Sequence, residues 1–224
     1  EPGARLVFDL VPGTTKYDFI EAVKNGTLEN YLRYIEVYPG DVLNIPAGLV
    51  HAIGKGIILA EIQQNSDATY RLYDFNRIGK DGKKRPLHID KALDLINFNS
   101  EAPKEKSKGI RINLDSASSK TYLVANKYFS VELLDVNGKF RDLADGSKFQ
   151  IFSFIDGEGE IIYKNGNINM KALESVLIPA DMGEYEILGR FKALKAYVPE
   201  LENDVIAPLE KAGYTKQQIL DALS

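Results

Sequence analysis

Residues 38–77 read YPGDVLNIPAGLVHAIGKGIILAEIQQNSDATYRLYDFNR, a stretch in which short apolar runs alternate with turn-forming residues. The turns are marked by Pro and Gly at three places: Pro39–Gly40, Pro46–Gly48 and Gly54–Gly56. This rhythm predicts a mainly β fold, a sandwich or a barrel, in preference to a parallel sheet. His51 follows a sharp reversal, and on a barrel wall the alternation of a strand would turn His51 and Ile53 inward.

The composition narrows the classes of function. The 224 residues carry 28 basic and 32 acidic side chains, a formal net charge of −4, which argues against nucleic acid as the main partner. The longest apolar runs, such as Ile57–Ala60, are far shorter than the roughly 20 residues that span a bilayer. No apolar leader opens the chain, so we expect no membrane partner and a cytoplasmic location. With no cysteine and two histidines, a metal site with several histidines from this chain alone is nearly excluded.

Local signals predict elements outside this stretch. Leu6–Leu10 is predicted as a strand, and Thr14 as the N-cap of the helix that follows it. His88 precedes a predicted helix over 89–95 and is expected to be a surface residue. Gly157–Gly159 is predicted as the tight turn of a hairpin between two flanking strands.

A weak internal repeat links two parts of the chain. Residues 42–47, VLNIPA, match residues 175–180, SVLIPA, in their Ile-Pro-Ala core. Five residues past the proline, the first copy has His51 and the second has Glu184. The pattern predicts two related β units, of which only one carries a histidine.

From Glu200 the pattern becomes helical. Thr215 followed by Gln218 is a capping-box signature before an apolar helix face. We expect a helical hairpin packed on the barrel, with a partner-binding tail as the alternative.

Four polar residues of the opening stretch are candidates for chemistry. His51 is either a ligand or catalytic residue, or a hydrogen-bonded core histidine. Glu61 lies in an apolar run, where a carboxylate needs a cation, a metal or several donors unless it faces water at a strand end. Arg71 could hold a phosphate or stabilise a developing oxyanion if it faces a β lumen, although exposed strand arginines are common. Arg77 could add a second positive charge.

Three motifs, taken together, carry a family resemblance: Pro46–Ala52 (PAGLVHA), Ala60–Asp67 (AEIQQNSD) and Thr69–Asp74 (TYRLYD). Their order, spacing and flanking glycines closely resemble the signature of type I phosphomannose isomerases (mannose-6-phosphate isomerases) of the bacterial kind. Weaker similarity extends upstream to Glu1 and downstream through the predicted helix near Leu87–Ile96.

The resemblance implies a zinc enzyme that interconverts mannose 6-phosphate and fructose 6-phosphate, so that the partner is a small sugar phosphate. By the same resemblance His51 is a zinc ligand, Arg71 is the catalytic arginine and Glu61 lines the active site. Arg77 occupies the place of a basic residue near the substrate phosphate. The catalytic base stays open between Glu61 and a water on the zinc.

The resemblance also implies a fold, a mainly β bicupin of double-stranded β-helix (jelly-roll) barrels with a few helices and an incomplete first cupin. Residues 1–98 would be the C-terminal part of the catalytic cupin with inserted helices. Residues 99–119, polar and poor in large apolar groups, would be a connector. Residues 120–198 would form a second, degenerate cupin, and 199–224 the helical tail.

The chain departs from the family pattern in one respect. Family members carry, before the point where this chain begins, a Gln-x-His zinc-ligand motif, a further glutamate ligand and phosphate-binding lysines. His51, with or without Glu61, falls short of the three protein ligands usual for catalytic zinc. We therefore expect the C-terminal portion of an isomerase, with zinc weak or absent in this chain alone, little turnover, and the missing N-terminal segment as a partner.

Two rival functions stay open. A non-catalytic cupin could bind a sugar or sugar phosphate through Arg71 and Arg77. A different metal-dependent cupin, such as an oxygenase, would need more than two histidines and ranks last.

Overall fold

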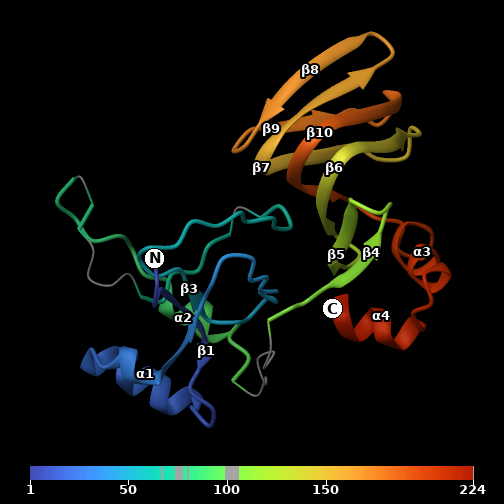
Figure 1. Cartoon of the computed structure of the whole chain (residues 1–224). Helices are drawn as coiled ribbons and strands as arrows, with labels where there is room; N and C mark the ends of the chain where they lie inside the picture. Colours follow the sequence, from blue (N-terminus) through green and yellow to red (C-terminus); the bar gives the residue numbers. More distant parts are fainter. Residues whose placement is uncertain (67, 74–77, 80, 99–105, 224) are drawn as a thin grey trace. The chain divides into compact units, whose positions relative to one another are not determined.

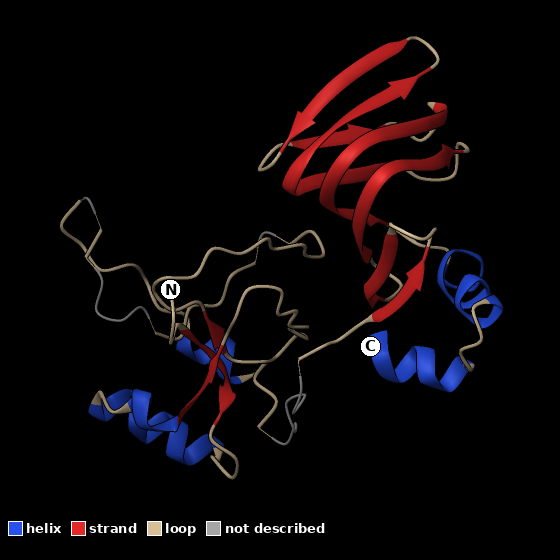
Figure 2. Cartoon of the chain, in the orientation of Figure 1, coloured by secondary structure: helices blue, strands red, loops and turns tan. Residues whose placement is uncertain are grey.

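The computed structural model of the chain describes residues 1–66, 68–73, 78–79, 81–98 and 106–223. They form two compact units, Glu1–Ala60 with Asn65–Lys106, and Glu61–Gln64 with Ser107–Ser224. Antiparallel sheets organise both units and helices are few, which confirms the mainly β class (Figure 1; Figure 2). Among the helices of the described residues, none is long and apolar enough to cross a membrane.

The first unit is built on a three-stranded antiparallel sheet in the order β2-β1-β3. Its strands are β1 (Arg5–Leu10), β2 (Leu32–Glu36) and β3 (His51–Ala52), and its helices are α1 (Lys16–Asn25), the 3-10 helix η1 (Leu28–Tyr31) and α2 (Ile89–Leu93). The central strand β1 is buried on both faces, because Val7 and Phe8 are each 2% exposed and enter different apolar clusters. The strand predicted at Leu6–Leu10 is therefore confirmed.

Helix α1 begins one residue later than the sequence predicts. The N-cap is Thr15, whose hydroxyl accepts from the Asp18 N–H while the Asp18 carboxylate accepts from the Thr15 N–H. Thr14 is instead buried, and its hydroxyl donates to the carbonyl of Val11 at 2.6 Å. The prediction of Thr14 as the cap was wrong because both threonines suit the position locally and only the buried turn distinguishes them.

Residues 53–66 form no strand, although the apolar run within them favours one. Ile58 is 99% exposed, and Ile53, like the His51 side chain, faces solvent. The expectation that His51 and Ile53 share an inward barrel face was therefore wrong. A strand needs a neighbour for its backbone N–H and C=O groups, and the described residues contribute none to this segment.

The second unit contains a seven-stranded antiparallel sheet whose order is β4-β5-β6-β10-β7-β8, with β9 paired to β7. The strands are β4 (Ile110–Asn113), β5 (Ser119–Ala125), β6 (Ser130–Ala144), β7 (Gln150–Tyr163), β8 (Gly166–Lys171), β9 (Ser175–Ile178) and β10 (Gly183–Tyr197). Strand β10 lies between β6 and β7, a non-sequential order typical of jelly-roll architectures. Strand β4 lies inside the predicted connector, so that segment contributes to the sheet.

The predicted hairpin turn at Gly157–Gly159 does not exist, because β7 continues through it as one strand. Gly159 instead belongs to a row of glycines across three strands, in register with Gly189 of β10, which in turn faces Gly138 of β6. Gly138 and Gly189 have φ of +125° and +151°. Glycines aligned in this way bend a sheet without interrupting it, so the glycine signal was correct and its assignment to a turn was wrong.

The long strands of the second unit curl back on themselves. Lys195 lies opposite Glu132 in the β6–β10 register, yet its Nζ is 2.5 Å from Oδ2 of Asp142, ten residues further along β6. Ten residues of flat strand span about 33 Å, far more than a lysine side chain reaches. The inner face of this curled sheet holds the main core, which includes Leu134, Phe152 and Ile187 at 0% exposure.

The C-terminal segment packs on the second unit, as expected for a helical hairpin. It contains the π-helix η2 (Glu202–Ile206), α3 (Ala207–Lys211) and α4 (Lys216–Leu223). Its buried apolar side chains share a cluster with Ile110 of β4 and Tyr122 of β5. The predicted capping box is confirmed, because the Thr215 N–H donates to Gln218 Oε1 at 2.9 Å and the Gln218 N–H to Thr215 Oγ1 at 3.3 Å.

Candidate functional site

His51 is presented by a tight turn followed by a short strand. The Leu49 N–H donates to the Pro46 carbonyl at 3.2 Å, and Gly48 provides the positive φ of +86° that this turn requires. Strand β3 then begins, with His51 opposite Phe8 of β1. The His51 Nδ1 atom lies 3.0 Å from the Leu49 carbonyl oxygen. Since a carbonyl can only accept, Nδ1 donates, and the neutral ring keeps its lone pair on Nε2, the arrangement typical of metal-binding histidines.

The same turn occurs at the second copy of the repeat. The Met182 N–H donates to the Pro179 carbonyl at 3.3 Å, and β10 follows with Glu184 in the position that corresponds to His51. The repeat predicted from the Ile-Pro-Ala cores is therefore present as a shared turn that leads into a strand. Only the first copy places an imidazole there.

Arg71 is held by hydrogen bonds from a different part of the first unit, residues 86–88. Its backbone N–H donates to His88 Nδ1 at 3.2 Å, and its carbonyl accepts from the His88 N–H at 2.8 Å. The guanidinium Nη1 donates to the Pro86 carbonyl at 3.3 Å. Residues 68–73 form no strand, so the predicted strand face of Arg71 was wrong, and these contacts take the place of a ladder.

His51 and Arg71 are attached to one hydrophobic cluster. Val50 and Ala52, which flank His51, and Leu72, which follows Arg71, all pack against the core around Val7 and Phe19. Apolar neighbours therefore anchor the chain on both sides while the His51 imidazole faces solvent and Arg71 is half-buried. The segments that carry His51 and Arg71 are thus attached to a common core in the first unit.

The other two predicted site residues are placed differently. Glu61 is exposed and belongs to Glu61–Gln64, the short segment grouped with the second unit. Its side chain faces water, which is one of the two alternatives that the sequence left open, although Glu61 does not lie at the end of a strand. Arg77 lies outside the described residues.

His88 is the residue of this site that the sequence analysis missed. It was expected to be a surface residue, yet it is half-buried, and Tyr70 packs edge-on against its ring at 6.3 Å. The signal available in the sequence was its place directly before α2, where histidine is an unusual N-cap. In the structure its side chain makes no capping hydrogen bond.

The described part of the chain does not by itself hold a zinc ion. Within it, no group of three or more His, Cys, Asp or Glu side chains lies close enough to bind a metal. His51 has the tautomer of a ligand, but the described residues supply no second and third ligand beside it, whereas catalytic zinc uses three protein ligands. The donor set therefore fits one ligand of a zinc site and no more.

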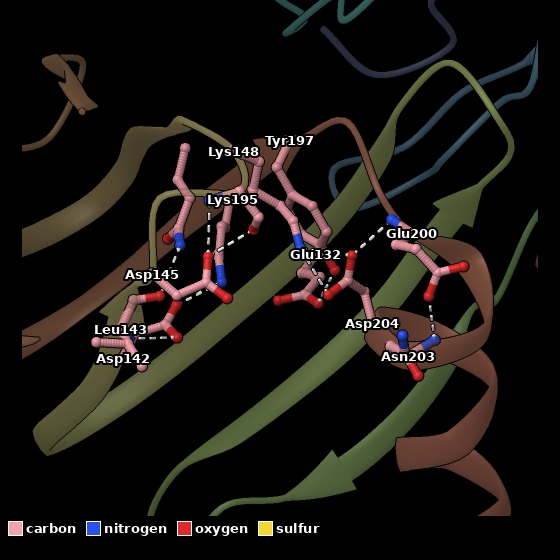
Figure 3. Close-up of polar contacts among 12 residues, drawn as sticks. Glu132, Asp142, Leu143, Asp145, Lys148, Lys195, Tyr197, Glu200, Asn203 and Asp204 are labelled. Atoms are coloured by element: carbon pink, nitrogen blue, oxygen red, sulfur yellow. Dashed lines mark hydrogen bonds and ion pairs between the residues drawn. The ribbon is translucent and has the colours of Figure 1, made fainter. Parts of the chain in front are cut away.

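A second concentration of charged side chains lies in the second unit (Figure 3). Its three lysines each have a carboxylate partner: Lys120 with Glu132 at 3.3 Å, Lys148 with Asp204 at 2.7 Å, and Lys195 with Asp142 at 2.5 Å. The Lys148–Asp204 pair joins the β6–β7 loop to the C-terminal segment. Because each lysine is already paired with a carboxylate, these lysines are poorly suited to binding a phosphate.

Three tyrosines border this network. Burial raises the pKa of Tyr122, Tyr185 and Tyr197 well above that of an ordinary tyrosine. The negative charge of Glu132 adds to the effect on all three pKa values, and that of Asp142 adds to it for Tyr122 and Tyr185. They are therefore neutral hydrogen-bond donors, as in the 2.7 Å bond from the Tyr197 hydroxyl to Glu132 Oε1.

Comparison with known proteins identifies relatives that match most of the chain. A family model described as the cupin domain of mannose-6-phosphate isomerase matches residues 118–198. The chain is 35% identical over 185 residues to the mannose-6-phosphate isomerase ManA of Bacillus subtilis, covering 83% of this chain and 58% of that protein. It is 33% identical to the putative mannose-6-phosphate isomerase YvyI of the same organism, over 82% of this chain and 57% of the relative.

Solved structures that are similar to the chain include a mannose 6-phosphate isomerase and a putative one. A crystal structure of the mannose 6-phosphate isomerase from B. subtilis superposes with a TM-score of 0.78 at 30% identity, covering 88% of this chain and 61% of that one. A putative mannosephosphate isomerase from Archaeoglobus fulgidus, at 16% identity and a TM-score of 0.59, shares the fold. The chain thus spans about three fifths of the length of the relatives it matches.

Proposed function

Since the chain is homologous to the cupin-type phosphomannose isomerases over most of its length, we propose that the protein interconverts mannose 6-phosphate and fructose 6-phosphate. The observation that carries this proposal is the 35% identity to a mannose-6-phosphate isomerase over 83% of the chain. A sugar phosphate is charged and does not cross membranes unaided, so we place the reaction in the cytoplasm.

The reaction moves a proton between C1 and C2 of the sugar and develops negative charge on the oxygens of an enediol-like intermediate. Arg71 suits the stabilisation of that charge, because a guanidinium stays protonated and presents five donors, of which Pro86 engages one. The two backbone hydrogen bonds to His88 support a fixed position for this residue. We assign Arg71 as the group that stabilises the developing oxyanion.

Glu61 and Arg77 complete the proposed site. Glu61 is the carboxylate that lines it, and a carboxylate is a suitable group to carry the proton between the two carbons. Arg77 is assigned to the phosphate of the substrate, since arginine binds phosphate with two parallel hydrogen bonds.

We further propose that His51 contributes one ligand to a zinc ion whose remaining ligands come from outside this chain. Zinc would act as a Lewis acid on the sugar oxygens. The Nε2 lone pair set by the Leu49 carbonyl supports the role of His51, and the relatives' greater length accommodates further ligands.

The proposal is tested by measuring fructose 6-phosphate formed from mannose 6-phosphate by the chain alone and with the N-terminal segment of the family supplied. We expect turnover with the segment present, and a loss of about 100-fold or more in kcat for Arg71→Lys, as for the removal of an oxyanion donor. Arg141→Lys, an exposed change on β6, is the matched control and should leave the rate unchanged.

A complemented protein that binds mannose 6-phosphate without converting it would contradict the isomerase assignment. That result would establish the alternative, a non-catalytic cupin that binds a sugar phosphate. The feature that favours this alternative is the incomplete ligand set of the described residues.

A further inference from the structure

Arg71 and His88 form a reciprocal pair of hydrogen bonds across 17 residues of sequence. The Arg71 N–H donates to His88 Nδ1 at 3.2 Å, and the His88 N–H donates to the Arg71 carbonyl at 2.8 Å. Both backbone polar groups of Arg71 are therefore satisfied by a single residue. In a strand these groups would bond to neighbouring strands, but residues 68–73 belong to none.

The hydrogen bond to the imidazole determines the state of the ring. A ring nitrogen accepts a hydrogen bond only when it carries no proton, so His88 is neutral with its proton on Nε2. Tyr70 packs edge-on against the same ring, with an interplanar angle of 81°. The ring of Tyr70 and the backbone N–H of Arg71 thus hold the His88 ring in one orientation.

The segment that carries His88 is itself anchored to the core. His88 precedes α2, and its carbonyl accepts from the Ala92 N–H at 3.0 Å. Ala92 is 3% exposed, and Leu93 packs against the same cluster as Leu72. The guanidinium of Arg71 also donates to Pro86, two residues before His88. The same short segment therefore contacts Arg71 at its backbone and at its charged end.

We propose that His88 is a positioning residue, which fixes the backbone of Arg71 so that the guanidinium is held where the reaction needs it. This role rests on the proposed function of Arg71. His88 acts through Arg71 and does not itself touch the substrate. A displacement of Arg71 of about 1 Å would be enough to lower the rate, because oxyanion stabilisation depends on donor geometry.

Three substitutions separate this role from a merely structural one. His88→Asn retains an acceptor near the position of Nδ1, whereas His88→Gln moves the acceptor toward the position of Nε2 and His88→Leu removes it. Asp90→Asn, an exposed change in the first turn of α2, is the matched control. His88→Gln also serves if His88→Leu fails to fold.

The first measurement is amide hydrogen exchange of the Arg71 N–H in this chain. We expect at least tenfold faster exchange in His88→Leu and His88→Gln than in the wild type, and protection close to wild type in His88→Asn and Asp90→Asn. This measurement is independent of any activity. Equal protection in all four variants would overturn the proposal.

The second measurement is isomerase activity with the N-terminal segment supplied. We expect His88→Leu and His88→Gln to lower kcat at least tenfold with KM for mannose 6-phosphate within a few-fold, and His88→Asn to restore most of kcat. Unchanged kcat in His88→Leu, in an assay where Arg71→Lys is inactive, would overturn the positioning role. If Arg71→Lys is itself fully active, the proposed function of Arg71 fails, and the exchange measurement still decides whether His88 holds its backbone.

Discussion

Glu132 is the most demanding single residue of the second unit, because its carboxylate is 1% exposed in the interior of the curled sheet. Its Oε1 accepts from the Tyr197 hydroxyl at 2.7 Å and from Lys120 at 3.3 Å. Its Oε2 has no hydrogen-bond partner within the described residues. A buried carboxylate depends strongly on the few donors it has, since each lost donor leaves charge uncompensated in a low dielectric.

Tyr197→Phe should therefore destabilise the second unit by about 1.5–3 kcal/mol, the range for a hydrogen bond to a charged group. The ring and its packing are retained, so the loss reports on the hydroxyl. Tyr128→Phe is the control, because Tyr128 is 46% exposed. Urea unfolding measures both, and equal free energies of unfolding for the two variants would contradict this account of Glu132.

At the scale of elements, the bend of the sheet depends on glycines that lie in register across β6, β10 and β7. The three glycines differ in their surroundings. A Cβ added to Gly189 would lie 2.3 Å from the Glu158 carbonyl oxygen and 2.8 Å from the Cα of Gly159, whereas one added to Gly138 would meet nothing within 4 Å. Both Gly138 and Gly189 have positive φ. A comparison of alanine substitutions at the two positions therefore measures the cost of the steric overlap at Gly189.

Gly138→Ala should cost about 1–3 kcal/mol, the penalty of a sparsely populated backbone conformation with positive φ for a residue with a Cβ. Gly189→Ala should cost more than Gly138→Ala, about 3 kcal/mol or more, since it adds overlap with the backbone of β7 to a backbone penalty of this kind. Thermal melting of the two variants compares them directly. Similar melting temperatures would show that the strands can separate at this row and that the close approach is not needed for the bend.

At the scale of the whole chain, stability at high pH should be limited by the second unit, which buries Tyr122, Tyr185 and Tyr197. Burial raises their pKa, so they stay protonated in the folded state above about pH 10, where unfolded tyrosines ionise. The folded state then binds more protons than the unfolded state. Their contribution is fully present below about pH 10 and is lost as the pH rises further.

We expect cooperative alkaline unfolding, with stability falling by up to about 4 kcal/mol per pH unit if all three tyrosines contribute. Tyrosinate absorbance and circular dichroism should change together, and Tyr185→Phe should make the pH dependence shallower. Full ionisation of the tyrosines near pH 10 without loss of secondary structure would contradict the burial argument.

Sequence patterns predicted an element correctly where the interactions that form it join residues close together in the sequence. The Thr215–Gln218 capping box and the Pro46–Leu49 turn depend on residues within three or four positions of one another, so their patterns are sufficient. The predicted N-cap of α1, Thr14, is only one residue away from the actual N-cap, Thr15, because the capping signal is local as well. The glycines at 157–159 were detected, but whether such a signal ends a strand or bends it depends on neighbouring strands.

The sequence by itself determined the mainly β class, the turn that presents His51 and the capping box of α4, because short-range sterics and hydrogen bonding specify them. Only the tertiary structure decided that His88 holds Arg71 over 17 residues and that Lys195 reaches Asp142 over 53. Such pairs form only when a sheet curls or a helix docks on a core. That geometry arises from the packing of the whole unit, which no local pattern encodes.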